Sequence, residues 1–136
     1  MVCIYCHNKT QIINSRHLTR INGTWRRRKC PKCSAVFTTD EVAQYDALWM
    51  IRDTTSMVLS SFKRDRLFLT VYDSCGHRKQ AVSDSTNLTD TIIAKLGNKQ
   101  GKGIIDITDL KQLTYSTLNR FDKVAGVHYL AYHGPL

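Results

Sequence analysis

Two short stretches decide the fold of the N-terminal part of the chain: CIYC at Cys3–Cys6 and CPKC at Cys30–Cys33. Each stretch places two residues between its cysteines, and 23 residues separate the two pairs. Two intervening residues let a tight turn point both thiolates at one ion, and two such turns complete a tetrahedral shell. The spacing therefore predicts a zinc ribbon whose ligands are Cys3, Cys6, Cys30 and Cys33.

The predicted metal is one structural Zn²⁺ per chain rather than a catalytic ion. Four thiolates fill the shell, so no coordination position is left for a water molecule. A redox dithiol, a chance pairing of cysteines and an iron–sulfur cluster remain alternatives. With four cysteines available as ligands, we expect His7 to lie at the surface, and we expect the remaining cysteine, Cys75, to be a small packing residue.

The segment between the cysteine pairs predicts a basic hairpin. Residues 10–16 alternate as a strand does, Asn22-Gly23 is a turn signature, and residues 25–30 lead back to the second pair. Arginine binds phosphate or guanine through two parallel hydrogen bonds. We expect one DNA-binding face made of Arg16, Arg26, Arg27, Arg28 and Lys29, the alternative being a solvated charge run. Trp25 either packs inside the ribbon or stacks on a base.

The charge of the chain is concentrated at its start. Residues 1–45 hold 8 basic and 2 acidic side chains, whereas residues 46–136 hold 12 and 9. Such an excess favours a polyanionic partner, nucleic acid before an anionic membrane surface. No stretch approaches the roughly 20 apolar residues of a membrane span, and the first residues lack the pattern of a signal peptide. We expect a cytoplasmic protein with two domains, 1–45 and 46–136, joined by a linker at 42–47.

Residues 46–136 predict a small, mostly helical domain, so that the fold class of the chain is α+β with a short sheet. Apolar spacing favours helices at about 63–75 and 88–96, ended by Gly76 and Gly97, with a flexible loop at 97–103. Thr108 is the expected N-cap of a third helix. Asp122 is the expected N-cap of a fourth, although the apolar pattern after it also suits a strand. Met57–Leu59 reads as strand or core.

The ribbon residues resemble a known family. Ser15-Arg16, the run RRRKCPKC at Arg26–Cys33 and FTTDE at Phe37–Glu41 closely resemble the zinc ribbon of the NrdR transcriptional repressors, bacterial proteins that control ribonucleotide reductase genes. In that family the ribbon is followed by an ATP-cone, a domain that senses ATP and dATP and sets the oligomeric state. The resemblance therefore implies double-stranded DNA, adenine nucleotides and further copies of the chain as partners.

Residues 46–136 resemble a divergent ATP-cone. The similar segments are Leu48–Asp53, Phe62–Leu67 and Asp122–Tyr129, the last with Gly126 where the family has an aromatic residue. Ile51 and Thr54 stand where the family has lysine and glycine. Arg52 and Arg66 match basic positions of the family, and charge and placement beside a helix N-terminus near Lys63 complete the expected nucleotide contacts, which are Arg52, Lys63, Arg64 and Arg66.

Three functions follow from these patterns, and they differ in class. The first is a zinc-dependent DNA-binding repressor, regulated by ATP or dATP binding and by oligomerisation. The second, suggested by Ile51 and Thr54, is a nucleic-acid accessory protein whose cone domain only oligomerises. The third, an enzyme, is disfavoured because the sequence has no Walker-type GxxxxGK motif and no nucleophile paired with a base.

Overall fold

The structure is a computed structural model, and it describes residues 1–19, 21–99 and 103–134. It divides into two compact units, Met1–Ala43 and Gln44–Leu136, each of which is described by itself. The boundary lies two residues before the expected one. The expected linker at 42–47 contains ordered elements, since strand β3 ends at Val42 and a short 3-10 helix, η1, spans Tyr45–Ala47.

The N-terminal unit is a three-stranded antiparallel meander. Its strands are β1 (Gln11–Leu18), β2 (Gly23–Lys29) and β3 (Val36–Val42), in the order β1-β2-β3. The Asn-Gly turn lies between β1 and β2 as predicted, with Asn22 in the left-handed region at φ 47°. Ile13 is the extra residue of a β-bulge in β1. In this unit the buried apolar residues are two of the four paired cysteines, Cys3 and Cys30.

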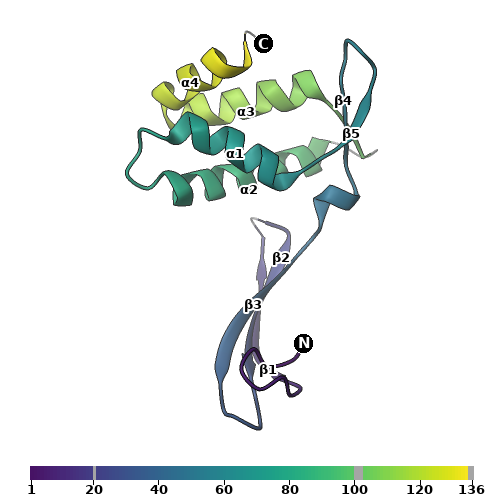
Figure 1. Cartoon of the computed structure of the whole chain (residues 1–136), viewed down its shortest axis with the longest axis vertical. Coiled ribbons are helices and arrows are strands. Elements are labelled where there is room, and N and C mark those ends of the chain that lie inside the picture. Colours follow the sequence, from purple (N-terminus) through teal and green to yellow (C-terminus); the bar gives the residue numbers. More distant parts are fainter. Residues whose placement is uncertain (20, 100–102, 135–136) are drawn as a thin grey trace. The chain divides into compact units, whose positions relative to one another are not determined.

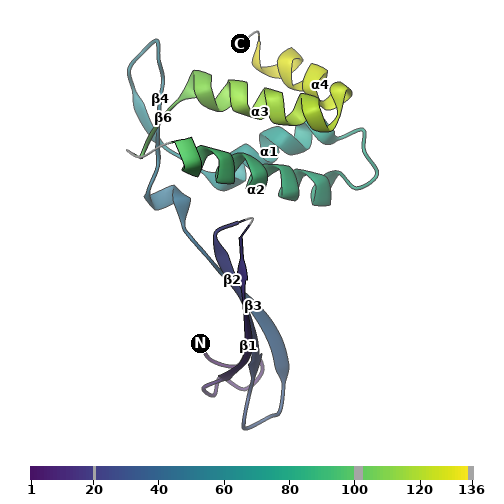
Figure 2. The ribbon, with the colours of Figure 1, turned by 180° about the vertical axis from the view of Figure 1, so that it is seen from behind.

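The C-terminal unit combines a small sheet with four helices (Figures 1 and 2). The sheet has the strands β4 (Met50–Arg52), β5 (Leu59–Ser61) and β6 (Ile104–Asp106), in the order β5-β4-β6, with β4 and β6 parallel. The helices are α1 (Arg64–Cys75), α2 (Ala81–Lys99), α3 (Ile107–Phe121) and α4 (Lys123–His133). The predicted α+β class is confirmed. None of the described helices is long and apolar enough to cross a membrane.

Helix α2 is longer at both ends than the apolar spacing predicted. It begins at Ala81 instead of Leu88. The sequence did not indicate this start because residues 83–87 are all polar and form no apolar stripe. Gly97 does not end the helix. A Cβ atom at Gly97 would lie 3.7 Å from the indole of Trp49, which is an ordinary van der Waals distance. Residues 97–99 of the predicted flexible loop 97–103 belong to α2 instead. Residues 100–102 of that loop lie outside the described residues.

The predicted N-cap of α3 was wrong, whereas the predicted N-cap of α4 is confirmed. The N-cap of α3 is Asp106, not Thr108, because the unpredicted strand β6 runs directly into the helix. The segment after Asp122 is a helix, and Asp122 caps it by accepting a hydrogen bond from the Val124 backbone N–H at 2.8 Å. The buried face of α4 is Ala125, Gly126 and Tyr129, whereas Val124 and Val127 are exposed.

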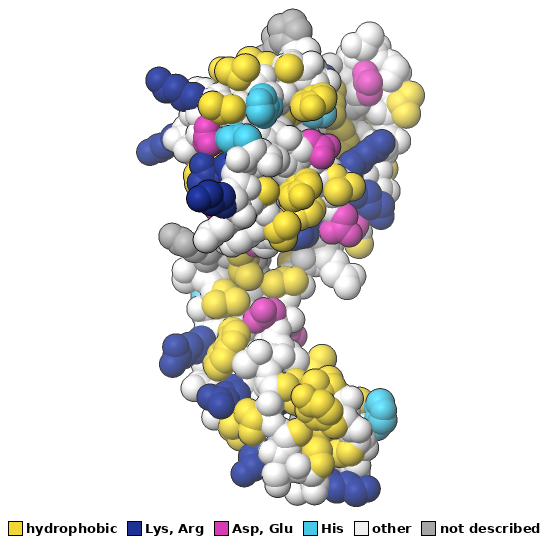
Figure 3. Space-filling model, turned by 60° about the vertical axis from the view of Figure 1, so that its left-hand side comes forward, with side chains coloured by type: hydrophobic (Ala, Val, Ile, Leu, Met, Phe, Trp, Pro, Cys, Tyr) yellow, Lys and Arg dark blue, Asp and Glu magenta, His cyan; other side chains and the backbone are white. Residues whose placement is uncertain are grey.

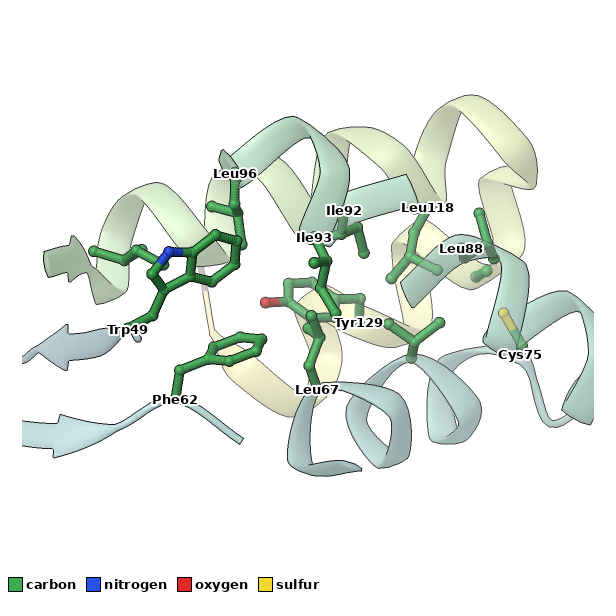
Figure 4. Packing of buried hydrophobic residues seen from close by; sticks show 13 residues of the cluster. Trp49, Phe62, Leu67, Cys75, Leu88, Ile92, Ile93, Leu96, Leu118 and Tyr129 are labelled. Carbon is green, nitrogen blue, oxygen red and sulfur yellow. The ribbon is translucent and has the colours of Figure 1, made fainter. Parts of the chain in front are cut away.

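The hydrophobic core belongs to the C-terminal unit. It runs from Trp49 and Phe62 beside the sheet to Leu88 and Cys75 at the opposite end of the helices (Figure 4). Cys75 is fully buried there, as expected of a packing residue. Met57 and Val58 are 63% and 62% exposed and are therefore not core residues. They lie in the turn between β4 and β5, where Met57 adopts φ 59°.

Candidate functional site

The two cysteine pairs lie on matching turns. The carbonyl oxygen of Cys3 accepts a hydrogen bond from the His7 N–H, and that of Cys30 accepts one from the Ser34 N–H, both at 3.0 Å. His7 and Ser34 have nearly equal positive φ values, 57° and 58°. Each turn thus directs its two thiols to the same side. His7 is exposed, as expected, and takes part in the turn through its backbone.

The four thiols converge on one point. All four Sγ atoms lie within 4.8 Å of one another, with separations of 3.5 Å for Cys6–Cys30 and Cys6–Cys33 and 3.6 Å for Cys3–Cys33. A tetrahedron with Zn–S bonds of about 2.3 Å has edges of about 3.8 Å, so the donor set fits Zn²⁺ in type, number and spacing. The described residues contain no other cluster of this kind.

Hydrogen bonds prepare this cluster for a cation. The backbone and side-chain N–H groups of Asn8 lower the pKa of the Cys6 thiol to about 6, because both favour the thiolate. At Cys33 the Ala35 N–H also favours the thiolate, but the neighbouring cysteines outweigh it and raise the pKa to about 12. Thiolates crowded together repel each other, and a bound divalent cation removes that repulsion.

The basic residues beside this centre lie on two faces of the sheet, because successive side chains of a strand point to opposite sides. This corrects the expectation of a single face. Register places Arg16 opposite Trp25, and Arg27 and Lys29 lie on the same side as that pair. We name these four residues the Trp25 face. The opposite side, the Arg26 face, consists of Arg26, Arg28, Thr39 and Glu41.

The two faces differ in the partners of their guanidinium groups. On the Arg26 face, Arg26 forms an ion pair with Glu41 at 2.8 Å, and Arg28 donates to the Thr39 hydroxyl at 3.1 Å. On the Trp25 face, the guanidinium carbon of Arg16 lies 5.9 Å from the centroid of the Trp25 ring. Figure 3 shows Lys and Arg side chains spaced along one side of this lower unit, together with a group of apolar side chains.

The C-terminal unit contains a cavity of about 220 Å³ between the sheet and helices α1, α3 and α4. Three cationic side chains line it: Lys63, Arg66 and Lys111. Ile51 and Tyr129 supply apolar surface, and His133 closes the α4 side. The rings of Tyr129 and His133 lie 4.5 Å apart, and burial lowers the pKa of His133. The cavity therefore presents positive charge next to aromatic surface.

The four expected nucleotide contacts divide into two groups. Lys63 and Arg66 line the cavity, although Lys63 also forms an ion pair with Asp46 at 3.5 Å. Arg52 instead donates two hydrogen bonds to Asp106, at 2.6 and 3.0 Å, and Arg64 pairs with Asp90 at 2.6 Å. Neither Arg52 nor Arg64 lines the cavity.

Sequence reasoning did not identify Lys111, Tyr129 and His133 as cavity residues. They belong to α3 and α4, more than 40 residues beyond the motif that suggested the other contacts. Only the packing of α4 against α1, and of α3 against α4, brings them to the cavity. One signal was present in the sequence: Lys111 follows Leu110 directly and therefore lies at the edge of an apolar stripe.

Comparison with known proteins agrees with this arrangement. Residues 1–41 match the family model described as "Transcriptional repressor NrdR-like, N-terminal domain". The chain is 26% identical to the transcriptional repressor NrdR of Acetivibrio thermocellus over 95% of its own length and 84% of the relative's. It is 29% identical to that of Polynucleobacter necessarius over 95% and 86%, and 25% identical to that of Clostridioides difficile over 97% and 82%. The resemblance seen in the sequence is confirmed, and it extends through both units.

Proposed function

We propose that this chain, which is similar to NrdR repressors over nearly its whole length, is a zinc-dependent transcriptional repressor. The observation that carries the proposal is the four-thiol centre at the base of a basic sheet, within the segment that matches the NrdR-like N-terminal model. Zinc replaces a hydrophobic core that the ribbon lacks, and the sheet presents cations to the phosphate backbone of DNA. By the same resemblance, its targets are ribonucleotide reductase genes.

The C-terminal unit is the proposed sensor of ATP and dATP. Three positive charges, from Lys63 at the N-cap of α1, Arg66 in α1 and Lys111 in α3, suit the negative charge of a triphosphate. Tyr129 and His133 supply aromatic surface for a base. This set differs from the expected one: Lys111 takes the place of Arg52 and Arg64, whose charges are balanced by Asp106 and Asp90.

Control of DNA binding requires the nucleotide to bind two assemblies of the chain unequally. Self-association is supported by the outer surface of α4, where Val124, Val127 and Tyr132 are 48%, 65% and 72% exposed. A helix that is apolar on its outer as well as its inner side is typical of a helix buried in an assembly. We therefore include homo-oligomers in the proposal, with the nucleotide favouring the assembly that fits the operator.

A second candidate function keeps the ribbon and omits the sensing. Two observations favour it: Arg52 and Arg64 are held in ion pairs, and Ile51 presents an apolar side chain to the cavity. In this case the chain is a zinc-ribbon nucleic-acid-binding accessory protein, and its C-terminal unit serves oligomerisation alone.

Calorimetry with ATP, dATP and GTP distinguishes the two functions. We expect an adenine nucleotide to bind the wild-type chain. We expect three substitutions each to weaken the affinity for that nucleotide: Lys63→Ala, Arg66→Ala and Lys111→Ala. Arg120→Ala is the matched control, since Arg120 is exposed on α3 and does not line the cavity. Light scattering of the same samples reports the assembly. Absence of binding at millimolar nucleotide supports the accessory protein.

A further inference from the structure

We propose that DNA is bound by the Trp25 face of the ribbon sheet, and that the Arg26 face is held by contacts inside the ribbon. The inference rests on the proposed function, because it requires DNA as the partner. It divides a run of four consecutive basic residues, Arg26–Lys29, into two that bind DNA and two that stabilise the sheet.

Exposure distinguishes the two faces. Arg16, Arg27 and Lys29 are exposed, whereas Arg26 and Arg28 are half-buried. The stems of Arg26 and Arg28 lie on the same side of the sheet as Phe37 and Thr39, which are also half-buried. Long basic side chains cover apolar surface in this way while their charged ends reach a partner. The Arg26 face is thus the packed side of the ribbon, and the Trp25 face is the open side.

The partners of the basic side chains also differ between the two faces. On the Arg26 face, the carboxylate of Glu41 at 2.8 Å competes with a phosphate for Arg26, and the Nε–H of Arg28 already donates to the Thr39 hydroxyl. The Trp25 face has Asp40 as its acidic residue, opposite Trp25 on the outer strand β3. Asp40 repels phosphate from the β3 side. The cations that remain to contact DNA lie on β1 and on the half of β2 that leads to the metal centre.

The spacing of the Trp25 face suits both phosphate binding and base reading. Arg27 and Lys29 are two residues apart on one strand, about 6.8 Å, and Arg16 continues the row on the neighbouring strand. Asn14 lies directly opposite Arg27 on the same face. Arginine recognises guanine and asparagine recognises adenine through paired hydrogen bonds in the major groove. We therefore assign base reading to Arg27 and Asn14, and phosphate contact to Arg16 and Lys29.

Trp25 has a positioning role in this scheme. Its ring lies 5.9 Å from the Arg16 guanidinium carbon, within the range of a cation–π contact. Such a contact restricts the Arg16 side chain before DNA arrives, so less conformational entropy is lost on binding. This role differs from the two alternatives named for Trp25 in the sequence, which were packing inside the ribbon and stacking on a base.

Matched substitutions test the inference in the full, zinc-loaded chain. Arg16→Gln and Arg27→Gln remove cations from the Trp25 face, and Arg26→Gln and Arg28→Gln remove cations from the other. Duplex binding is measured at several salt concentrations. We expect Arg16→Gln and Arg27→Gln to weaken binding by at least about fivefold, and Arg16→Gln to reduce the slope of log affinity against log salt by about one. Arg26→Gln and Arg28→Gln leave that slope unchanged.

A second measurement needs no substitution. The chain has two tryptophans, of which Trp49 is buried and Trp25 is half-buried, so acrylamide quenching reports mainly on Trp25. Saturating DNA should protect Trp25 from quenching. This readout decides the question alone if Arg26→Gln or Arg28→Gln releases zinc.

Two results would overturn the assignment. One is unchanged Trp25 quenching on saturating duplex. The other is a loss of affinity confined to Arg26→Gln and Arg28→Gln with zinc retained. A wild-type chain that binds no duplex contradicts the proposed function itself, whichever face is substituted.

Discussion

Three hydrogen bonds of the helical unit converge on the side chain of Asp122. One carboxylate oxygen caps α4, and the other accepts from His77 at 3.0 Å and from Arg78 at 2.9 Å. Arg78 also pairs with Asp84 at 2.6 Å. These contacts tie the turn between α1 and α2 to the junction of α3 and α4. The hydrogen bonds from His77, and then those from Arg78, hold the pKa of Asp122 far below its usual range.

This shift in pKa gives a prediction with a definite sign. A carboxyl group with a lowered folded-state pKa stabilises the fold at pH values above its unfolded pKa, and the effect is lost as pH falls toward the folded value. We expect Asp122→Asn to lower the Tm of the helical unit by several degrees at pH 6 and by clearly less at pH 2, where the pH approaches the folded-state pKa. Circular dichroism at 222 nm follows the helices. An equal difference at both pH values would exclude the ionised carboxylate as the cause.

Asp122 also marks the limit of sequence reasoning at this scale. An aspartate just before an apolar helical run is an N-cap signal, and the cap was predicted correctly. Its partners His77 and Arg78 lie 45 and 44 residues away in the sequence. No local pattern links them. The same holds for Lys111, which reaches the cavity only through the packing of α3.

Helix α4 lies unusually close to α3, and Gly126 permits the approach. A Cβ atom at Gly126 would lie 2.8 Å from the Cβ of Asn119 and 3.0 Å from its Cα. The Cα of Asn119 belongs to the α3 backbone and its Cβ is bonded directly to that backbone, so neither atom can move without shifting the helix. The sequence comparison noted Gly126 only as a departure from the family's aromatic residue. The structure explains this departure, because a side chain at position 126 would collide with Asn119 of α3.

We predict that Gly126→Ala destabilises the helical unit by about 1–3 kcal/mol, the usual cost of overpacking. Urea unfolding followed at 222 nm measures it. Gly76→Ala is the control, since a Cβ there meets its nearest neighbour at 3.6 Å and Gly76 has an ordinary φ of −57°. If both substitutions have the same small effect, the close α3–α4 contact does not stabilise the unit.

The elements themselves were predictable where the pattern was strong. The hairpin β1–β2, helix α1 and the cap of α4 follow from alternation, apolar spacing and an N-cap residue. The polar start of α2 and the three-residue strand β6 were missed, because neither carries a periodic apolar signal. The division of the basic run between two faces could have been derived from the sequence. A strand was predicted there, and successive side chains of a strand point to opposite sides of the sheet.

The two units of the chain are stabilised in different ways. Every residue of the buried hydrophobic cluster belongs to the C-terminal unit, while the ribbon buries Cys3 and Cys30. Counting cysteines and charges was enough to separate the ribbon from the helical part. The charge pattern alone predicts binding to nucleic acid, and the similarity to the NrdR repressors is the basis for the more specific proposed function.

We therefore predict that zinc removal unfolds the ribbon and leaves the helices folded. Metal analysis should find one zinc ion per chain, and a chelator should abolish DNA binding while most of the signal at 222 nm remains. Two buried cysteines provide a matched pair. Cys30→Ala should lose zinc, whereas Cys75→Ala, in the helical core, should retain it. Retained zinc in Cys30→Ala, or full DNA binding in chelator, would contradict the structural role of the metal.

The central claim is that a zinc ribbon binds operator DNA under the control of an adenine nucleotide. The most direct test is the affinity of the zinc-loaded chain for a palindromic duplex from upstream of ribonucleotide reductase genes and for a scrambled duplex. Each is measured without nucleotide, with ATP and with dATP at one salt concentration. The account predicts preference for the operator and a change of about 5- to 150-fold with one of the nucleotides. Equal affinity for both duplexes, unaltered by either nucleotide, would contradict it.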